Sequence, residues 1–191
     1  MISSRPSPLS RTLALVPPTV LLAAQYASGA FTAYIEIEGI KGEATEEAHK
    51  GWIEVGSVQW GVGRAISSPA GGNREASAPS ISEITLTKTL DSTSPKLFLL
   101  AVGGGIPAGV TVKLHLVDTT GGTGTVFYEL ILSNVLVSSQ SNSASPGDGR
   151  PQESISLNFT KIEVAYTPTD AKGAPGTPVR AGYDLATQKI L

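Results

Sequence analysis

The chain has 191 residues, of which 40% are hydrophobic and 16% are charged, so it is long enough for a sizeable core and carries fewer charges than most soluble domains. Its formal net charge is −2 and it has no basic run, which disfavours nucleic-acid binding through a patch that follows the phosphates. The absence of cysteine excludes disulfides, thiolate chemistry and cysteine-based metal sites.

The first thirty residues differ in composition from the remainder of the chain. Residues 1–30 contain two arginines and no acidic residue, and an apolar run extends from Thr12 to Ala24. A basic start, an apolar middle and a small-residue end are typical of a secretory signal. Pro17 and Pro18 interrupt the run, which is too short to span a membrane as a helix. We therefore expect a leader at 1–30, either signal-like, disordered or the result of a start site placed too early, and a single β-domain at 31–191.

Alternating apolar and polar residues predict strands in the first half of that domain. Ile35 and Ile37 alternate with acidic residues, and after an acidic connecting loop the segment 52–63 continues the alternation. The segment 64–80 is poor in large apolar residues and has the composition of a long exposed loop. Loops of this length within compact domains are usually functional or disordered. A third strand is expected at 81–90.

The segment 91–103, DSTSPKLFLLAVG, predicts one short helix. Ser94 suits the N-cap position, Pro95 suits the first helical position, and Gly103 would end the helix. Apolar residues lie nearly all round this helix: Leu97, Phe98, Leu99, Leu100 and Val102. A helix so short is not stable alone. We expect it to be covered on one side by its own domain and on another by a neighbouring molecule.

The second half of the chain again alternates. Strands are expected at 109–117, 126–139, 153–166 and 181–191, and a Ser/Gly/Pro-rich loop separates the second from the third. The alternation changes parity at Thr160–Lys161, which predicts a bulge or bend. About seven antiparallel strands with one short α-helix indicate a mainly β fold, either a barrel or a two-sheet sandwich.

Residues with catalytic potential are few. The chain has two histidines, His49 and His115, and no G-x-S-x-G motif accompanies them, so we interpret both as solvated or interfacial. Acidic residues concentrate early in the domain, where a solvated face is a better interpretation than a glycosidase-like acid pair or a calcium site. These residues are Glu36, Glu38, Glu43, Glu46 and Glu47.

The remaining motifs also indicate structure rather than chemistry. The glycine-rich segments GGGIPAG and GGTGT lack the Lys-Ser/Thr of a phosphate-binding loop and are interpreted as turns. Trp52 and Trp60 are interpreted as core or interface anchors. We therefore predict no enzyme activity, no catalytic, cofactor-binding or metal-binding residues, and no cofactor.

Six segments occur together in a characteristic order between Thr32 and Ile190. They are YIEIEGIKGEA, WIEVGSVQWGVGR, ISEITLTKTLDSTSPKLFLLAVGGG, YELILSNVLVSSQS, ESISLNFTKIEVAYTP and AGYDLATQKI. Each segment alone is weakly specific, but their order and spacing resemble those of the Hcp family, the haemolysin-coregulated tube proteins of type VI secretion.

The resemblance implies a structural function. Proteins of this family are expected to fold as a β-barrel of two sheets with one helix and to form hexameric rings that stack into a hollow tube. A contractile sheath would drive the tube and its spike protein out of the cell, with secreted effectors in the lumen. Assembly in the cytoplasm followed by secretion is implied, without catalysis or a cofactor. On this view, Leu97→Asp or Leu100→Asp is expected to abolish ring formation.

Two other functions remain open at this point. A secreted β-sandwich domain that binds a ligand or carbohydrate would predict leader cleavage, a monomer, and a pocket containing Trp52 or Trp60. A hydrolase would need a pair of histidines with an acid, and nothing in the sequence places His49 beside His115.

Overall fold

The computed structural model describes residues 31–68, 72–103, 110–120, 124–147, 149–170 and 173–191. The expected leader at 1–30 lies outside the described residues, so its separation from the domain stays a prediction. The segment 104–109, most of the expected GGGIPAG turn, and residues 121–123 of the GGTGT turn also lie outside them.

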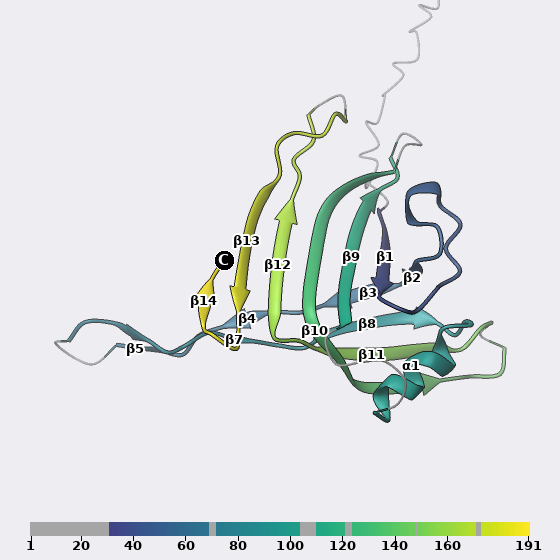
Figure 1. Ribbon diagram of the computed structural model, residues 1–191, viewed down its shortest axis with the longest axis horizontal. Coiled ribbons are helices and arrows are strands. Elements are labelled where there is room, and N and C mark those ends of the chain that lie inside the picture. The colour runs from purple at the N-terminus through teal and green to yellow at the C-terminus, as the bar shows by residue number, and fades with distance from the viewer. Residues whose placement is uncertain (1–30, 69–71, 104–109, 121–123, 148, 171–172) are drawn as a thin grey trace, which may run out of the picture.

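Ten strands form one hydrogen-bonded network that folds into two layers (Figure 1). The first layer has the order β2-β1-β9-β10-β12-β13-β14, and every neighbouring pair is antiparallel. Its strands are β1 (Phe31–Ile37), β2 (Ile53–Val55), β9 (Val110–Asp118), β10 (Thr125–Ser143), β12 (Lys161–Tyr166), β13 (Val179–Asp184) and β14 (Lys189–Ile190). A 3-10 helix, η1 (Glu47–His49), lies in the loop between β1 and β2.

The second layer has the order β3-β8-β11-β10 and is also antiparallel. It consists of the C-terminal part of β10 together with β3 (Ser57–Gln59), β8 (Ile84–Thr89) and β11 (Gln152–Asn158). The helix α1 (Ser94–Ala101) follows β8 and packs against β10. The fold class expected from the sequence is confirmed: mainly antiparallel β, two sheets, and one α-helix among the described residues.

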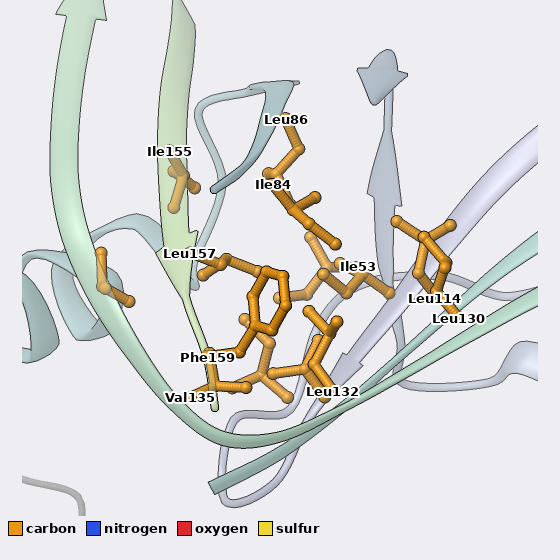
Figure 2. Packing of buried hydrophobic residues seen from close by; sticks show 14 of the residues in the cluster. Ile53, Ile84, Leu86, Leu114, Leu130, Leu132, Val135, Ile155, Leu157 and Phe159 are labelled. Atoms are coloured by element: carbon orange, nitrogen blue, oxygen red, sulfur yellow. The ribbon is translucent and has the colours of Figure 1, made fainter. Parts of the chain in front are cut away.

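The hydrophobic core lies between the two layers (Figure 2). Leu114 and Leu130 from the first layer approach Ile84 and Leu157 from the second and Phe159, which directly follows β11, and all of them are buried. On each strand the buried residues alternate with more exposed ones, because successive side chains of a strand point to opposite faces of its sheet. The apolar alternation in the sequence therefore identified the core-facing positions correctly.

Besides the connection from β8 through α1 to β9, the chain passes between the layers at three places among the described residues. β10 bends near Asn134, whose φ of 54° is unusual for a residue other than glycine, and its pairing with β11 is irregular between Val137 and Ser139. Gly56 lies between β2 and β3, which belong to different layers. The third crossing separates β11 from β12 at 159–160, which confirms the bend expected from the change in parity at Thr160–Lys161.

Three boundaries expected from the sequence were wrong. The segment 64–80 is not an irregular loop, because it contributes to two short antiparallel pairs: β4 (Val62–Gly63) with β7 (Ser80–Ile81), and β5 (Ile66–Ser67) with β6 (Glu75–Ala76). We call the segment 62–81 the arm, which projects from the two layers in Figure 1. Its backbone groups pair across the hairpin even though the side chains offer little to bury.

The two other corrections concern strand ends. Residues 140–143, expected in a loop, are the end of β10, which is 19 residues long. The expected strand at 181–191 is a hairpin of β13 and β14. The backbone N–H of Thr187 donates to Asp184 Oδ1 over 2.8 Å, and Gln188 has a φ of 54°. This aspartate-based turn reverses the chain where alternation alone predicted continuation.

Candidate functional site

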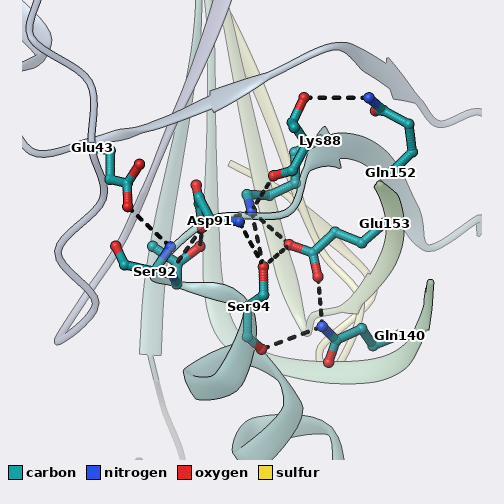
Figure 3. Close-up of polar contacts among 10 residues, drawn as sticks. Glu43, Lys88, Asp91, Ser92, Ser94, Gln140, Gln152 and Glu153 are labelled. Atoms are coloured by element: carbon teal, nitrogen blue, oxygen red, sulfur yellow. Dashed lines mark hydrogen bonds and ion pairs between the residues drawn. The ribbon is translucent and has the colours of Figure 1, made fainter. Parts of the chain in front are cut away.

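A buried network of charges fixes the start of α1 to the second layer (Figure 3). Lys88 Nζ lies 2.5 Å from Glu153 Oε1 and 2.8 Å from Asp91 Oδ1. Ser94 Oγ donates to the same Glu153 oxygen over 2.7 Å, and Gln140 Nε2 donates to the other over 2.6 Å. The side chains of Lys88 and Glu153 are both almost fully buried, so each charge depends on the other for its stabilisation.

The strand register explains why these charges are buried. Lys88 on β8 lies directly opposite Glu153 on β11. On its strand Lys88 continues the core-facing series of Ile84 and Leu86, and Glu153 precedes Ile155 in the corresponding series of β11. The sequence contained this signal, because one charged residue stood at a core-facing position on each strand, but the strand pairing was needed to recognise it.

Asp91 completes the network from the loop before α1. Burial opposes its ionisation, but the hydrogen bonds from Lys88 and Thr93 outweigh burial and lower the pKa of Asp91. The cation of Lys88 is therefore flanked by the carboxylates of Asp91 and Glu153. Within the described residues, Gln140 Oε1 is the one buried side-chain oxygen or nitrogen without a hydrogen-bond partner.

Ser94 has a different function from the one expected. The N-cap position is Thr93, and its side chain makes no capping hydrogen bond. Ser94 instead uses its hydroxyl to bind Glu153 and to accept from the backbone N–H of Asp91 over 3.1 Å. The end of the helix was predicted correctly: Gly103 has a φ of 81°, and its N–H donates to the carbonyl of Leu100 over 3.1 Å.

The helix has one buried side and one exposed side. Leu97 is fully buried in the core, and Leu100 packs against the core. Phe98, Leu99 and Val102 are 57%, 52% and 62% exposed, respectively. We call these three residues the helix patch. An aspartate at position 97 would therefore disrupt the chain's own core, so that variant does not isolate assembly as the sequence interpretation supposed.

A second apolar surface lies beyond β10, where the base of the arm meets β12 and β13. It is a groove of about 220 Å³ with almost entirely apolar lining. The lining residues are Trp60, Val62, Pro79, Ile81, Ile162, Val164, Ala181, Gly182 and Tyr183. Trp60 is partly buried against the core, which agrees with its interpretation as a core or interface anchor. We call this surface the arm groove.

The two histidines lie together, and His49 is buried, so the solvated alternative of the sequence interpretation was wrong for His49. His49 is 2% exposed, and its Nε2 lies 2.8 Å from Nδ1 of His115. His49 Nδ1 lies 2.6 Å from Glu46 Oε2, and His115 Nε2 lies 3.2 Å from Glu129 Oε1. The sequence could not show this, because 66 residues separate the rings and only the folded loop brings them together.

The remaining acidic residues do not converge on one point. Glu36 pairs with Lys113 at 3.1 Å, Glu38 accepts from the backbone N–H of Thr111, and Glu43 accepts from that of Ser92. Over the described ranges, no group of three or more His, Asp or Glu could hold a metal ion. Among the described residues, no helix is long and apolar enough to cross a membrane.

Comparisons with known proteins give one consistent result. The family model described as the type VI secretion system effector Hcp matches residues 34–166. Protein hcp1 of Pseudomonas aeruginosa is 32% identical over 156 residues, which cover 80% of this chain and 93% of that protein. A solved type six secretion system protein is 32% identical, with a TM-score of 0.78, over 85% of this chain and all of that one. Hcp1 from Salmonella typhimurium is 23% identical and has the same fold, with a TM-score of 0.68 over 85% of this chain and 99% of that one.

Proposed function

Because the chain belongs to the Hcp family of type VI secretion proteins, we propose that it is a structural subunit of the secretion tube. Identical copies form a hexameric ring, and the rings stack into a hollow tube that carries effectors. The contractile sheath and the spike protein are its other partners. The subunit assembles in the cytoplasm, leaves the cell with the tube and has a structural rather than a catalytic function.

The observation that carries this proposal is the presence of two apolar surfaces on different sides of the molecule. The helix patch lies on and directly after α1, whereas the arm groove is lined by β12, β13 and the base of the arm. Figure 1 places α1 and the pair of β12 and β13 on different sides of β10. Different surfaces that bind each other in successive copies make a head-to-tail contact, which closes into a ring when the rotation between copies allows it. We propose that the helix patch of one copy contacts the region of the arm groove in the next.

The exposure of the helix patch supports its use as an interface between copies. Two large apolar side chains on one eight-residue helix, Phe98 and Leu99, and a third at its C-cap, Val102, are each more than half exposed. Contiguous apolar patches of this kind mark interaction sites on soluble proteins. The alternative function, a ligand-binding domain, would need a depression near Trp52 or Trp60. Trp52 lines one depression and Trp60 lines another. Membership of the family favours the tube subunit.

The test is to add one charge to the helix patch. Leu99→Asp is expected to leave the fold intact, because Leu99 is exposed, and to convert rings into single chains, because the carboxylate would be buried in the contact. Size-exclusion chromatography with light scattering and negative-stain microscopy would measure the change.

The matched control is Lys96→Asp, which adds the same carboxylate to an exposed position of the same helix without removing apolar surface. We expect this variant to form normal rings. Normal rings from Leu99→Asp would contradict the proposed contact.

A further inference from the structure

Four ionisable side chains form a continuous chain that fastens the loop 38–52 to the first layer. Glu46 and His49 belong to the loop, whereas His115 lies on β9 and Glu129 on β10. The three contacts along the chain measure 2.6, 2.8 and 3.2 Å from Glu46 towards Glu129. His115 and Glu129 are directly opposite each other in the register of β9 and β10, so the sheet fixes their half of the chain.

Aromatic rings enclose the two imidazoles. Tyr34 stacks on His49 with ring centroids 4.7 Å apart and an angle of 9°. Trp52 contacts both imidazoles, with centroids 4.8 Å from His49 and 4.6 Å from His115. A ring enclosed in this way cannot exchange its hydrogen-bond partner for water unless the loop moves.

Other ionisable groups also surround the pair. Arg180 NH1 lies 3.3 Å from the second oxygen of Glu129, and Lys113 repels a proton on His115. The ionisable groups that face the pair come from each element packed around it: Tyr34 from β1, Glu46 from the N-cap of η1, Lys113 from β9, Glu129 from β10 and Arg180 from β13, which reaches Glu129. Glu54 on β2 acts on Tyr34 rather than on the imidazoles.

The number of protons shared by these four side chains determines how their contacts respond to acid. While both carboxylates are ionised, the three contacts need three protons, one in each. Two neutral imidazoles supply two protons, so one contact is without a proton. One additional proton fills all three contacts. With four protons, His49 Nε2 and His115 Nδ1 both carry hydrogens and face each other across 2.8 Å, so the central contact becomes repulsive.

We propose that the His49–His115 pair is an acid-operated latch, which holds the loop 38–52 on the first layer and releases it when both rings are protonated. The latch lies within a single polypeptide, so it is a property separate from the proposed assembly of several copies. Besides the latch, Glu43 attaches the middle of the loop to the backbone N–H of Ser92. Gly42 and Ala44 bond through their backbone N–H groups to carbonyls of Gly51 and Trp52, within the loop itself.

The direction of the pH effect follows from the linkage between proton binding and opening. Burial lowers the pKa of His115, and although Glu129 opposes this shift, the charges of His49 and Lys113 reinforce it. The closed loop therefore binds the proton on His115 more weakly than the open loop does. The latch is intact above the ordinary pKa of histidine, and its stabilisation is lost as the pH falls below that value.

Hydrogen–deuterium exchange of the full chain tests the latch. The reporters are peptides that cover 42–52, measured from about pH 7.5 to about pH 5 and corrected for the intrinsic pH dependence of exchange. In the wild-type chain, exchange of these peptides is expected to rise several-fold on acidification, whereas peptides from β9 and β10 stay protected. A flat response in 42–52, or an equal rise in β9 and β10, would overturn the proposal.

Two variants distinguish protonation of the histidine pair from protonation of other acidic groups. In His115→Asn, an amide can occupy the position of Nδ1 but cannot take up a proton, so the loop is expected to stay protected across the same range. Glu47→Gln changes an exposed acid of the same loop outside the chain of contacts and is expected to behave as wild type. Release in His115→Asn, or loss of release in Glu47→Gln, would contradict the latch.

A second measurement does not depend on the folding of His115→Asn. The chain has two tryptophans, so Trp52 is the one remaining tryptophan in Trp60→Phe. Trp52 contacts both imidazoles, so its fluorescence should respond when they are protonated. We expect a transition in Trp52 emission between the ordinary pKa ranges of histidine and carboxylates. Constant emission through that interval would refute protonation of the pair.

Discussion

The helix α1 and the arm are both additions to the two layers, but they are held in different ways. The helix begins in a network of buried charges and inserts Leu97 into the core. In the arm, every described side chain from Val62 to Ser67 is exposed, and backbone pairing links its two sides. The single chain therefore determines the position of α1, whereas the arm gains little from its own domain. Substitutions should consequently change stability in one region and assembly in the other.

The largest expected effect is on the charge network. Lys88→Met leaves the carboxylates of Asp91 and Glu153 without their buried cation, and we expect the free energy of unfolding to fall by about 3–5 kcal/mol. Urea denaturation would measure this change. Lys96→Met, on an exposed position of α1, should alter it by no more than about 0.5 kcal/mol. Equal effects of the two variants would show that the buried charges do not anchor the helix.

The two sides of α1 provide the next test. Leu97→Ala removes a fully buried side chain and is expected to destabilise the chain by about 2–5 kcal/mol, because a cavity remains in the core. Leu99→Ala on the exposed side should change the free energy of unfolding of the dissociated chain by no more than about 0.5 kcal/mol. Denaturation at protein concentrations at which both variants are single chains would compare them. A large loss in Leu99→Ala would mean that the helix patch belongs to the core.

Shortening the arm should have a small effect on stability. Replacing residues 66–76 with a two-residue Asn-Gly turn removes one short strand pair, and the described side chains in this range are exposed, so the unfolding free energy of the single chain should change by about 1 kcal/mol or less. Assembly should weaken, as sedimentation velocity would show. If this deletion unfolds the domain, the contrast between α1 and the arm is wrong.

The smallest effect concerns acid. The pKa of Asp91 is lowered in the folded chain, so its stabilisation is present above the ordinary carboxylate range and is lost as the pH falls through the lowered value. Asp91→Asn should therefore unfold with a shallower dependence on pH at the acid end. Thermal unfolding at several pH values would compare the variant with the wild-type chain. If the stability of the variant and of the wild-type chain depended on pH in the same way, Asp91 would not contribute to the acid sensitivity.

Local sequence patterns predicted the parts of the fold that depend on near neighbours. The apolar alternation located the core strands, and the change of parity at Thr160–Lys161 located a crossing between layers. Ser94 and Pro95 located the helix start to within one residue, since Thr93 is the N-cap, but the Ser94 hydroxyl binds Glu153, which is 59 residues away. The pairing of His49 with His115 likewise depends on how the loop 38–52 folds over β1 and β9. Such contacts follow from strand register and loop path, which alternation does not specify.

The most direct test of the central claim is the mass of the wild-type assembly in solution, measured by native mass spectrometry and followed by negative-stain microscopy. The account predicts a species of six chains that appears as a ring with a central hole. A chain that stays monomeric across a broad concentration range, with no rings on the grid, would contradict it.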